Sequence, residues 1–246
     1  MRALVRFLKR KTTAYLQHVA GLLVKDMELV RQHAATLESA EFVAGHMSGI
    51  RSFRSKFSLM EEALRAVNPK LAGLYCEFGV FQGKTINFIA SRTQSEVHGF
   101  DSFEGLPEDW RPGMDKGAFV VKNLPAVRPN VRLYKGWFNE TLPGFVKDHT
   151  GPIAFLHLDA DLYSSTKTVF EFLGDRIVPS TVIQFDEYFN YSGWQQGEHQ
   201  AFTEFCAERK IEFRYLGYTS NDEQVAVQIV KIEPSSGSDR PSLPHS

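Results

Sequence analysis

From Gly73 onward, short apolar runs alternate with segments of helical periodicity, and no other feature of this sequence limits the fold as strongly. Apolar runs bounded by turn signals are typical of strands buried inside a sheet. When such strands alternate with helices, they predict a mainly parallel sheet covered by helices on both faces. Seven runs have this character: 73–78, 97–102, 131–136, 153–159, 181–187, 211–217 and 224–230.

The segments between these runs complete the predicted domain plan. The last two strands are joined through 219–223 without a helix, which predicts an antiparallel hairpin at one edge of the sheet. Before the first strand, residues 25–68 keep a helical period with no strand pattern, and Pro69 ends it. We predict helices around 84–93, 139–147, 164–176 and 197–209. The predicted domains are a helical arm over 1–68, an α/β domain over 69–232 and a disordered Ser/Pro-rich tail over 233–246.

Composition excludes several classes of protein. The chain has 246 residues, an ordinary length for one α/β domain, and its net charge of −1 argues against a general nucleic-acid binder. Cys76 and Cys206 lie far apart and outside any CxxC pair, which excludes a disulfide scaffold and favours a reducing, cytoplasmic compartment. No apolar run reaches the ~18 residues of a membrane-spanning helix, so we expect no transmembrane segment.

The first 24 residues are basic and contain no acid. Leucines and valines recur among the basic residues near helical spacing, so the segment could be a signal peptide, a membrane-surface helix or a helical arm. We favour an arm that is solvated or docks on a partner subunit, because no small-x-small cleavage site follows. A homo-oligomer through the N-terminal helices is therefore one expectation. The basic residues are Arg2, Arg6, Lys9, Arg10 and Lys11.

A glycine loop follows the first predicted strand, with the spacing E-x-G-x-x-x-G from Glu77 to Gly83. A dinucleotide fingerprint starting at Gly79 would need glycine at the positions of Phe81 and Lys84. A P-loop would need glycine at position 78, which is phenylalanine. Both the NAD and the ATP hypotheses are weakened, and taken alone the loop is equally consistent with a plain strand-to-helix turn.

The end of the second predicted strand adds a specific signal. Asp101 lies there, 22 residues after Gly79, where an acid can accept hydrogen bonds from both hydroxyls of a ribose. A nucleoside ligand that needs no phosphate site is S-adenosylmethionine. In this interpretation Glu77 serves the methionine end of the cofactor and Asp101 serves its ribose.

Two further strand ends are acidic. Asp159 and Asp161 follow the fourth strand, and Asp186 and Glu187 follow the fifth. Carboxylate oxygens from neighbouring strand ends suit Mg²⁺, which could bind a substrate hydroxyl and lower its pKa. The alternatives are a helix N-cap after Asp161 and ordinary solvation, and we favour the metal.

Five strings together resemble the macrocin O-methyltransferase family of class I S-adenosylmethionine-dependent methyltransferases. The resemblance covers about residues 50–231. FDSFEGLPE and KGWFNETLP are unusual strings, which makes the match fairly specific. The strings are EFGVFQGKT (77–85), GFDSFEGLPEDW (99–110), KGWFNETLP (135–143), LDADLY (158–163) and FDEY (185–188).

The resemblance implies a Rossmann-like fold with strand order 3-2-1-4-5-7-6 and methyl transfer to a hydroxyl, typically on a sugar of a natural product. It implies metal positions at Asp159, Asp186 and Glu187, where Glu187 replaces the family's usual aspartate. It also implies that N-terminal helices cover the active site and help to form dimers, and that Trp137 and Phe138 wall the adenine pocket. We expect the cofactor at Glu77, Gly79, Gly83, Thr85, Asp101, Ser102, Trp137, Phe138 and Asp159.

The remaining aromatic and histidine residues leave alternatives open. The aromatics after the fifth strand could form an acceptor platform or a core cluster. We assign catalytic roles to Asp159 and, as a candidate general base, to His199, whereas His157 is expected in the core. The aromatics concerned are Tyr188, Phe189, Tyr191 and Trp194.

The leading hypothesis is a Mg²⁺-assisted O-methyltransferase that acts on a small, hydroxylated, glycosylated molecule. A second hypothesis is a nucleoside-binding module without catalysis that acts through its N-terminal arm. A third, a dehydrogenase, is disfavoured by the absent third glycine.

Overall fold

The computed structural model describes residues 11, 21 and 25–233, and the chain divides into two compact units. One unit comprises Met1–Ser48 with Asn190–Gly193, and the other comprises Gly49–Phe189 with Trp194–Ser246. Most of the predicted basic arm and nearly all of the predicted tail lie outside the described residues.

The first unit is built on α2 (Met27–His46). The Asp26 side chain caps this helix by accepting hydrogen bonds from the first backbone N–H groups, as an N-cap carboxylate does. The segment 190–193 is held by two side chains of α2. Gln32 donates to the Asn190 carbonyl at 2.6 Å, and the Ser39 hydroxyl accepts from the Asn190 N–H at 2.8 Å.

The second unit contains an eight-stranded sheet with the order β1-β7-β8-β6-β5-β2-β3-β4. Neighbouring strands are parallel except that β8 is antiparallel to both β6 and β7. Leaving β1 aside, this order confirms the predicted Rossmann-like arrangement. The strands are β1 (Ser52–Phe53), β2 (Leu74–Phe78), β3 (Val97–Asp101), β4 (Val131–Lys135), β5 (Ile153–Leu158), β6 (Val182–Phe185), β7 (Ile211–Thr219) and β8 (Val225–Ile232).

The eighth strand corrects the prediction of seven. β1 pairs in parallel with β7, Ser52 opposite Tyr218 and Phe53 opposite Thr219, and it forms the outer edge of the sheet. The β7–β8 hairpin is therefore one strand in from the edge where it was predicted. A strand of two residues is too short to show an alternating pattern in the sequence, so its pairing depends on the β7 edge.

The helix after β1 also belongs to the second unit. α3 (Lys56–Ala66) buries Leu59, Met60 and Ala63 completely. The boundary between the units therefore falls between Ser48 and Gly49, ahead of the predicted boundary at Pro69. Helical periodicity identifies an apolar face but does not tell which surface covers it, and here the sheet covers it.

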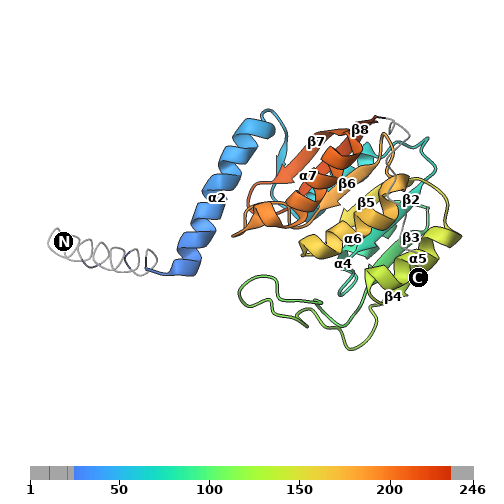
Figure 1. Cartoon of the computed structure of the whole chain (residues 1–246), viewed down its shortest axis with the longest axis horizontal. Helices are drawn as coiled ribbons and strands as arrows, with labels where there is room; N and C mark the ends of the chain where they lie inside the picture. Colours follow the sequence, from blue (N-terminus) through green and yellow to red (C-terminus); the bar gives the residue numbers. More distant parts are fainter. Residues whose placement is uncertain (1–10, 12–20, 22–24, 234–246) are drawn as a thin grey trace, which may run out of the picture. The chain divides into compact units, whose positions relative to one another are not determined.

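The other helices confirm the predicted alternation. α5, α6 and α7 lie side by side (Figure 1). α3 and α4 contact each other and pack on a core that includes Phe155 and Val182. Among the described residues, no helix is both long and apolar enough to cross a membrane. The helices are α4 (Lys84–Ala90), α5 (Phe138–Asp148), α6 (Tyr163–Leu173) and α7 (Glu198–Arg209), with 3-10 turns at η1 (Gly174–Arg176) and η2 (Trp194–Gln196).

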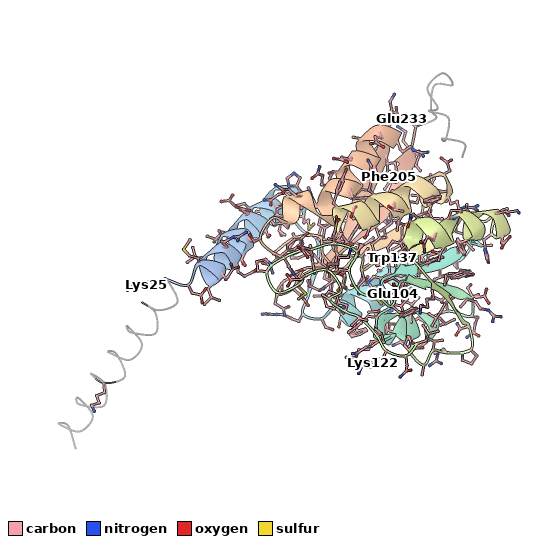
Figure 2. The ribbon with its side chains drawn as sticks, turned by 60° about the horizontal axis from the view of Figure 1, so that its bottom comes forward. Lys25, Glu104, Lys122, Trp137, Phe205 and Glu233 are labelled. Atoms are coloured by element: carbon pink, nitrogen blue, oxygen red, sulfur yellow. The ribbon has the colours of Figure 1, made fainter. Side chains whose placement is uncertain are left out.

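The direction of the chain reverses across the sheet between β2 and β5. β3 and β4 follow β2 on one side, and β5 and β6 lie on the other. Ligands in such sheets bind at the carboxyl ends of the strands, next to this reversal. Figure 2 labels Glu104 and Trp137, which come just after the carboxyl ends of β3 and β4.

Candidate active site

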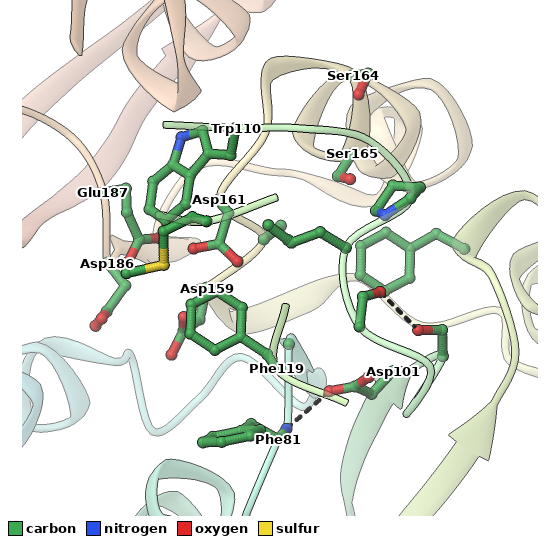
Figure 3. A pocket seen from close by; sticks show the side chains of 18 of the residues that line it. Phe81, Asp101, Trp110, Phe119, Asp159, Asp161, Ser164, Ser165, Asp186 and Glu187 are labelled. Carbon is green, nitrogen blue, oxygen red and sulfur yellow. Dashed lines mark hydrogen bonds between the residues drawn. The ribbon is translucent and has the colours of Figure 1, made fainter. Parts of the chain in front are cut away.

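A cavity of about 780 Å³ lies at the carboxyl ends of the parallel strands. Its lining comes from the loops after β2, β4, β5 and β6, from the long loop 102–130 after β3, and from side chains of α3 and α6 (Figure 3). A cavity of this volume is within the range of small-molecule and cofactor sites.

The glycine loop enters this cavity at Gly79. This residue has φ +89°, and a Cβ atom added to it would lie 1.7 Å from the carbonyl oxygen of Asp159. Glycine is required there because the loops after β2 and β5 meet backbone to backbone. Gly83, with φ +75°, is the N-cap of α4 and does not line the cavity.

Asp101 organises the same loop from β3. One carboxylate oxygen accepts from the N–H groups of Val80 and Phe81 at 2.8 and 2.7 Å, and the other accepts from Phe103 at 2.6 Å. Asp101 also lines the cavity. Because a carboxylate has about four acceptor positions, it can still accept from a bound hydroxyl.

Two residues predicted to bind the cofactor, Glu77 and Thr85, do not line the cavity. Glu77 is fully buried and does not line the cavity; it accepts from the Thr85 hydroxyl at 3.0 Å and lies 3.1 Å from Nδ1 of His157. His157 is also fully buried, as expected for a core histidine. Glu77 and Thr85 thus support the loop from beneath. The predicted residues that do line the cavity are Gly79, Asp101, Ser102, Trp137, Phe138 and Asp159.

The acids after β5 and β6 all line the cavity, but the structure groups them differently from the prediction. Ligand atoms of Asp159, Asp161 and Glu187 lie within 4.8 Å of one another, and those of His157, Asp159 and Asp186 form a second such group. Within the described part of the chain, no group joins Asp186 to Glu187. The predicted trio Asp159, Asp186 and Glu187 is therefore divided between two groups that share Asp159.

Asp186 has a cationic partner that the sequence did not suggest. Lys56, from the first turn of α3, places its Nζ 2.8 Å from Oδ2 of Asp186 and 3.9 Å from Oδ2 of Asp159. Nε2 of His157 lies 3.6 Å from the other oxygen of Asp186. Although burial disfavours the charged form, His157 and Lys56 hold the pKa of Asp186 below its ordinary value.

In the other group, Asp159 contacts Lys56 at the longer distance of 3.9 Å. Burial and neighbouring carboxylates raise the pKa values of Asp159 and Glu187 well above the ordinary range. Burial, against the opposing effect of Arg111, raises the pKa of Asp161 to about 7. Oε2 of Glu187 is buried and has no hydrogen-bond partner among the described residues.

These properties fit a divalent cation. Glu187 is buried and Asp159 and Asp161 are partly buried, so the three close carboxylates repel one another, and a hard cation with oxygen preference would relieve that repulsion. The alternative of a helix cap is wrong, because α6 has Leu162 as its N-cap and no side-chain cap bond.

Aromatic residues of the loop 102–130 form a wall that the sequence analysis missed. Trp110 and Phe119 line the cavity, and the Phe119 ring meets Phe81 edge-on with centroids 5.7 Å apart (Figure 3). Arg111 stacks on Trp110 at 3.9 Å and donates to both carboxylate oxygens of Glu223 at 2.9 and 3.0 Å. This bond ties the loop to the turn between β7 and β8. The sequence feature that could have revealed this wall is the aromatic content of the long loop between two strands.

Two alternatives were left open for the aromatics after the fifth predicted strand, an acceptor platform and a core cluster. The four side chains are 0–4% exposed, which favours the core cluster. His199 lies in the first turn of α7 with its ring edge-on to two of them, and it does not line the cavity. The four aromatics are Tyr188, Phe189, Tyr191 and Trp194.

Comparison with known proteins identifies the family to which this site belongs. The family model for macrocin-O-methyltransferase (TylF) matches residues 43–217, more than half of the chain. The chain belongs to the macrocin-O-methyltransferase family. This confirms the resemblance found in the strings around the glycine loop and the acidic strand ends.

Curated relatives of this family member are O-methyltransferases by name. The 8-demethyl-8-(2,3-dimethoxy-alpha-L-rhamnosyl)-tetracenomycin-C 4'-O-methyltransferase of Streptomyces olivaceus is 34% identical over 174 residues, 59% of this chain and 63% of the relative. The chain thus spans less than two thirds of that relative. The mycinamicin III 3''-O-methyltransferase of Micromonospora griseorubida is 26% identical over 202 residues, 70% of this chain and 75% of the relative.

Solved structures share the fold. The calicheamicin methyltransferase CalS11 has a TM-score of 0.56 at 20% identity and covers 89% of this chain and 92% of its own. The O-methyltransferase NovP has a TM-score of 0.55 at 22% identity and covers 72% of this chain and 80% of its own. Neither curated relative supports the alternative of a nucleoside-binding module without catalysis.

Proposed function

We propose that this chain is an S-adenosylmethionine-dependent O-methyltransferase that methylates a sugar hydroxyl of a glycosylated small molecule. One observation carries the proposal: the glycine loop and the acidic strand ends share one cavity, in contact through Gly79 and the Asp159 carbonyl. A methyl donor and a hydroxyl acceptor bound on the two sides of that contact are neighbours. The names of the curated relatives support the sugar acceptor.

The residues on the cofactor side have distinct tasks. Asp101 holds the glycine loop and accepts from the ribose, and Trp137 and Phe138 provide an apolar wall for the base. S-adenosylmethionine supplies an activated methyl group as a sulfonium. The chain orients donor and acceptor, and such positioning accounts for much of the rate in a transfer without covalent enzyme chemistry.

On the acidic side, we propose that Asp159, Asp161 and Glu187 hold a divalent cation of the Mg²⁺ type. When bound, this cation would lower the pKa of the acceptor hydroxyl. Asp186, paired with Lys56, keeps a negative charge beside the group. Trp110 and Phe119 face the same space and offer apolar ring faces, against which the C–H face of a sugar can pack.

The test is a turnover assay with the purified chain, S-adenosylmethionine and Mg²⁺. The acceptors are the compounds that the relatives' names give, a rhamnosyl tetracenomycin C and mycinamicin III, each paired with its aglycone as a control. We expect the mass of each glycoside to increase by one CH₂ unit and the aglycones to give no product. Methylation of aglycones alone would contradict the sugar acceptor, and binding of the cofactor without turnover on any hydroxyl would contradict the activity.

A further inference from the structure

Glu198, the first residue of α7, is a fully buried acid outside the cavity lining. Its Oε1 accepts from the Ala160 N–H and from the Thr166 hydroxyl, both at 3.3 Å, and its Oε2 accepts from the Glu187 N–H at 3.2 Å. Within the described residues it forms no salt bridge with a lysine, arginine or histidine. Its partners are two backbone amides and one hydroxyl.

Those two amides belong to the two loops that carry the cavity acids. Ala160 stands between Asp159 and Asp161 in the loop after β5, and Glu187 is itself one of the two acids that follow β6. One carboxylate therefore reaches both loops. Asp161 has φ +62°, an uncommon conformation for a residue other than glycine, so the loop needs such support.

Burying a carboxylate costs free energy of folding unless its oxygens are hydrogen-bonded. A helix N-terminus can be capped at lower cost by an exposed serine or aspartate, so a role as a helix cap does not account for this burial. The two contacts across loops do account for it, because they set the distance between Asp159, Asp161 and Glu187.

We propose that Glu198 is a positioning residue that holds the two acidic loops at the spacing required to bind a divalent cation, an inference that rests on the metal site of the proposed function. It touches neither the cation nor the substrate. Groups behind a metal's ligands commonly change its affinity by about 10–100-fold when they are altered.

Glu198→Gln is the informative substitution. A glutamine has the same length but offers one acceptor oxygen and an NH₂ group, so one of the two loop amides must face a donor. The probe is Mn²⁺ binding to the full chain, followed by electron paramagnetic resonance without any acceptor. We expect a Mn²⁺ affinity about 10–100-fold weaker and an unchanged affinity for S-adenosylmethionine, because Glu198 does not contact Asp101 or Gly79.

Glu208→Gln is the matched control, since Glu208 lies on the same helix with a side chain 61% exposed. It should leave both affinities unchanged. Hydrogen exchange of the metal-free protein gives a second measurement: the Ala160 and Glu187 amides should exchange faster in Glu198→Gln than in Glu208→Gln. If Glu198→Gln does not fold, Glu198→Asp, which keeps the charge but is shorter, should weaken Mn²⁺ binding in the same direction.

A folded Glu198→Gln protein that binds Mn²⁺ as the unsubstituted chain does would overturn the proposal, as would an unsubstituted chain that binds no Mn²⁺. A purely structural role would lower the melting temperature and leave the Mn²⁺ affinity of the folded protein unchanged. Neither measurement uses an acceptor, so failure of methyl transfer to glycosides is distinguishable from failure of this inference.

Discussion

The two sides of the cavity satisfy their polar groups in opposite ways. On the cofactor side, after β2, β3 and β4, the Asp101 carboxylate accepts three backbone hydrogen bonds. On the acidic side, after β5 and β6, buried and partly buried carboxylates lie close together, and one oxygen of Glu187 has no hydrogen-bond partner among the described residues. The cofactor side is therefore stable without a ligand, whereas the acidic side stores electrostatic repulsion that a cation would relieve.

The two sides of the cavity therefore favour their ligands for different physical reasons. A loop held by its own backbone bonds is preorganised, so a ligand gains affinity without paying to order it. A cluster of like charges favours a cation strongly but costs stability when none is bound. The predictions below separate the two sides.

The largest effect is expected from Asp159→Asn, because Asp159 belongs to both acidic groups. Loss of one preorganised charge should lower turnover on the order of 10²–10³-fold. S-adenosylmethionine affinity should change little, since Asp101 and the glycine loop are intact. Steady-state kinetics and calorimetry give the two values. EDTA should abolish turnover and Mg²⁺ restore it, and full activity of the metal-free protein in EDTA would contradict the comparison.

Gly79→Ala should break the contact between the two sides. Its Cβ would lie 1.7 Å from a backbone oxygen at a φ of +89°, so neither side can relax cheaply. We expect a loss of about 3 kcal/mol or more in the free energy of unfolding, measured by urea denaturation. Gly144→Ala, in α5 with open space around it, is the control and should be neutral or slightly stabilising. Equal stability of the two variants would show that the loops do not meet as described.

Asp101→Ala should weaken S-adenosylmethionine binding by about 1.5–3 kcal/mol, because it removes hydrogen bonds to an ionised acceptor. Mn²⁺ affinity should stay unchanged, which would assign the loss to the cofactor side alone. Calorimetry with each ligand measures both. An unchanged cofactor affinity would mean that the ribose is held elsewhere.

The smallest effect concerns pH and stability. The pKa of Asp161 rises on folding from 3.8 to about 7, so the folded state binds more protons than the unfolded state in this range. Stability therefore falls as pH rises through that window. We expect the metal-free chain to lose melting temperature from pH 5 to 7.5, and Asp161→Asn or added Mg²⁺ to reduce that loss. A loss of the same size in Asp161→Asn would assign it to other groups.

The secondary-structure elements, and the sheet edge at which the parallel strands end, follow from the sequence alone. Apolar runs are a local property, so the seven longer strands were predictable, and so was the arrival of Asp101, Asp159 and Asp186 at one sheet edge. The glycine at position 79 was also visible, although the reason for it was not, because the clashing oxygen lies in the loop after another strand.

Which acids become neighbours depends on the tertiary packing and cannot be read from the sequence. Lys56 reaches Asp186 across 130 positions of sequence, and Glu198 reaches the loops after both β5 and β6. The burial of Tyr188 and the exposure of the Trp110 loop to the cavity likewise depend on how the connections cross the sheet. Side-chain periodicity determines which residues share a face of one element. It carries no information on which distant element covers that face, and the grouping of charges at this site depends on that packing.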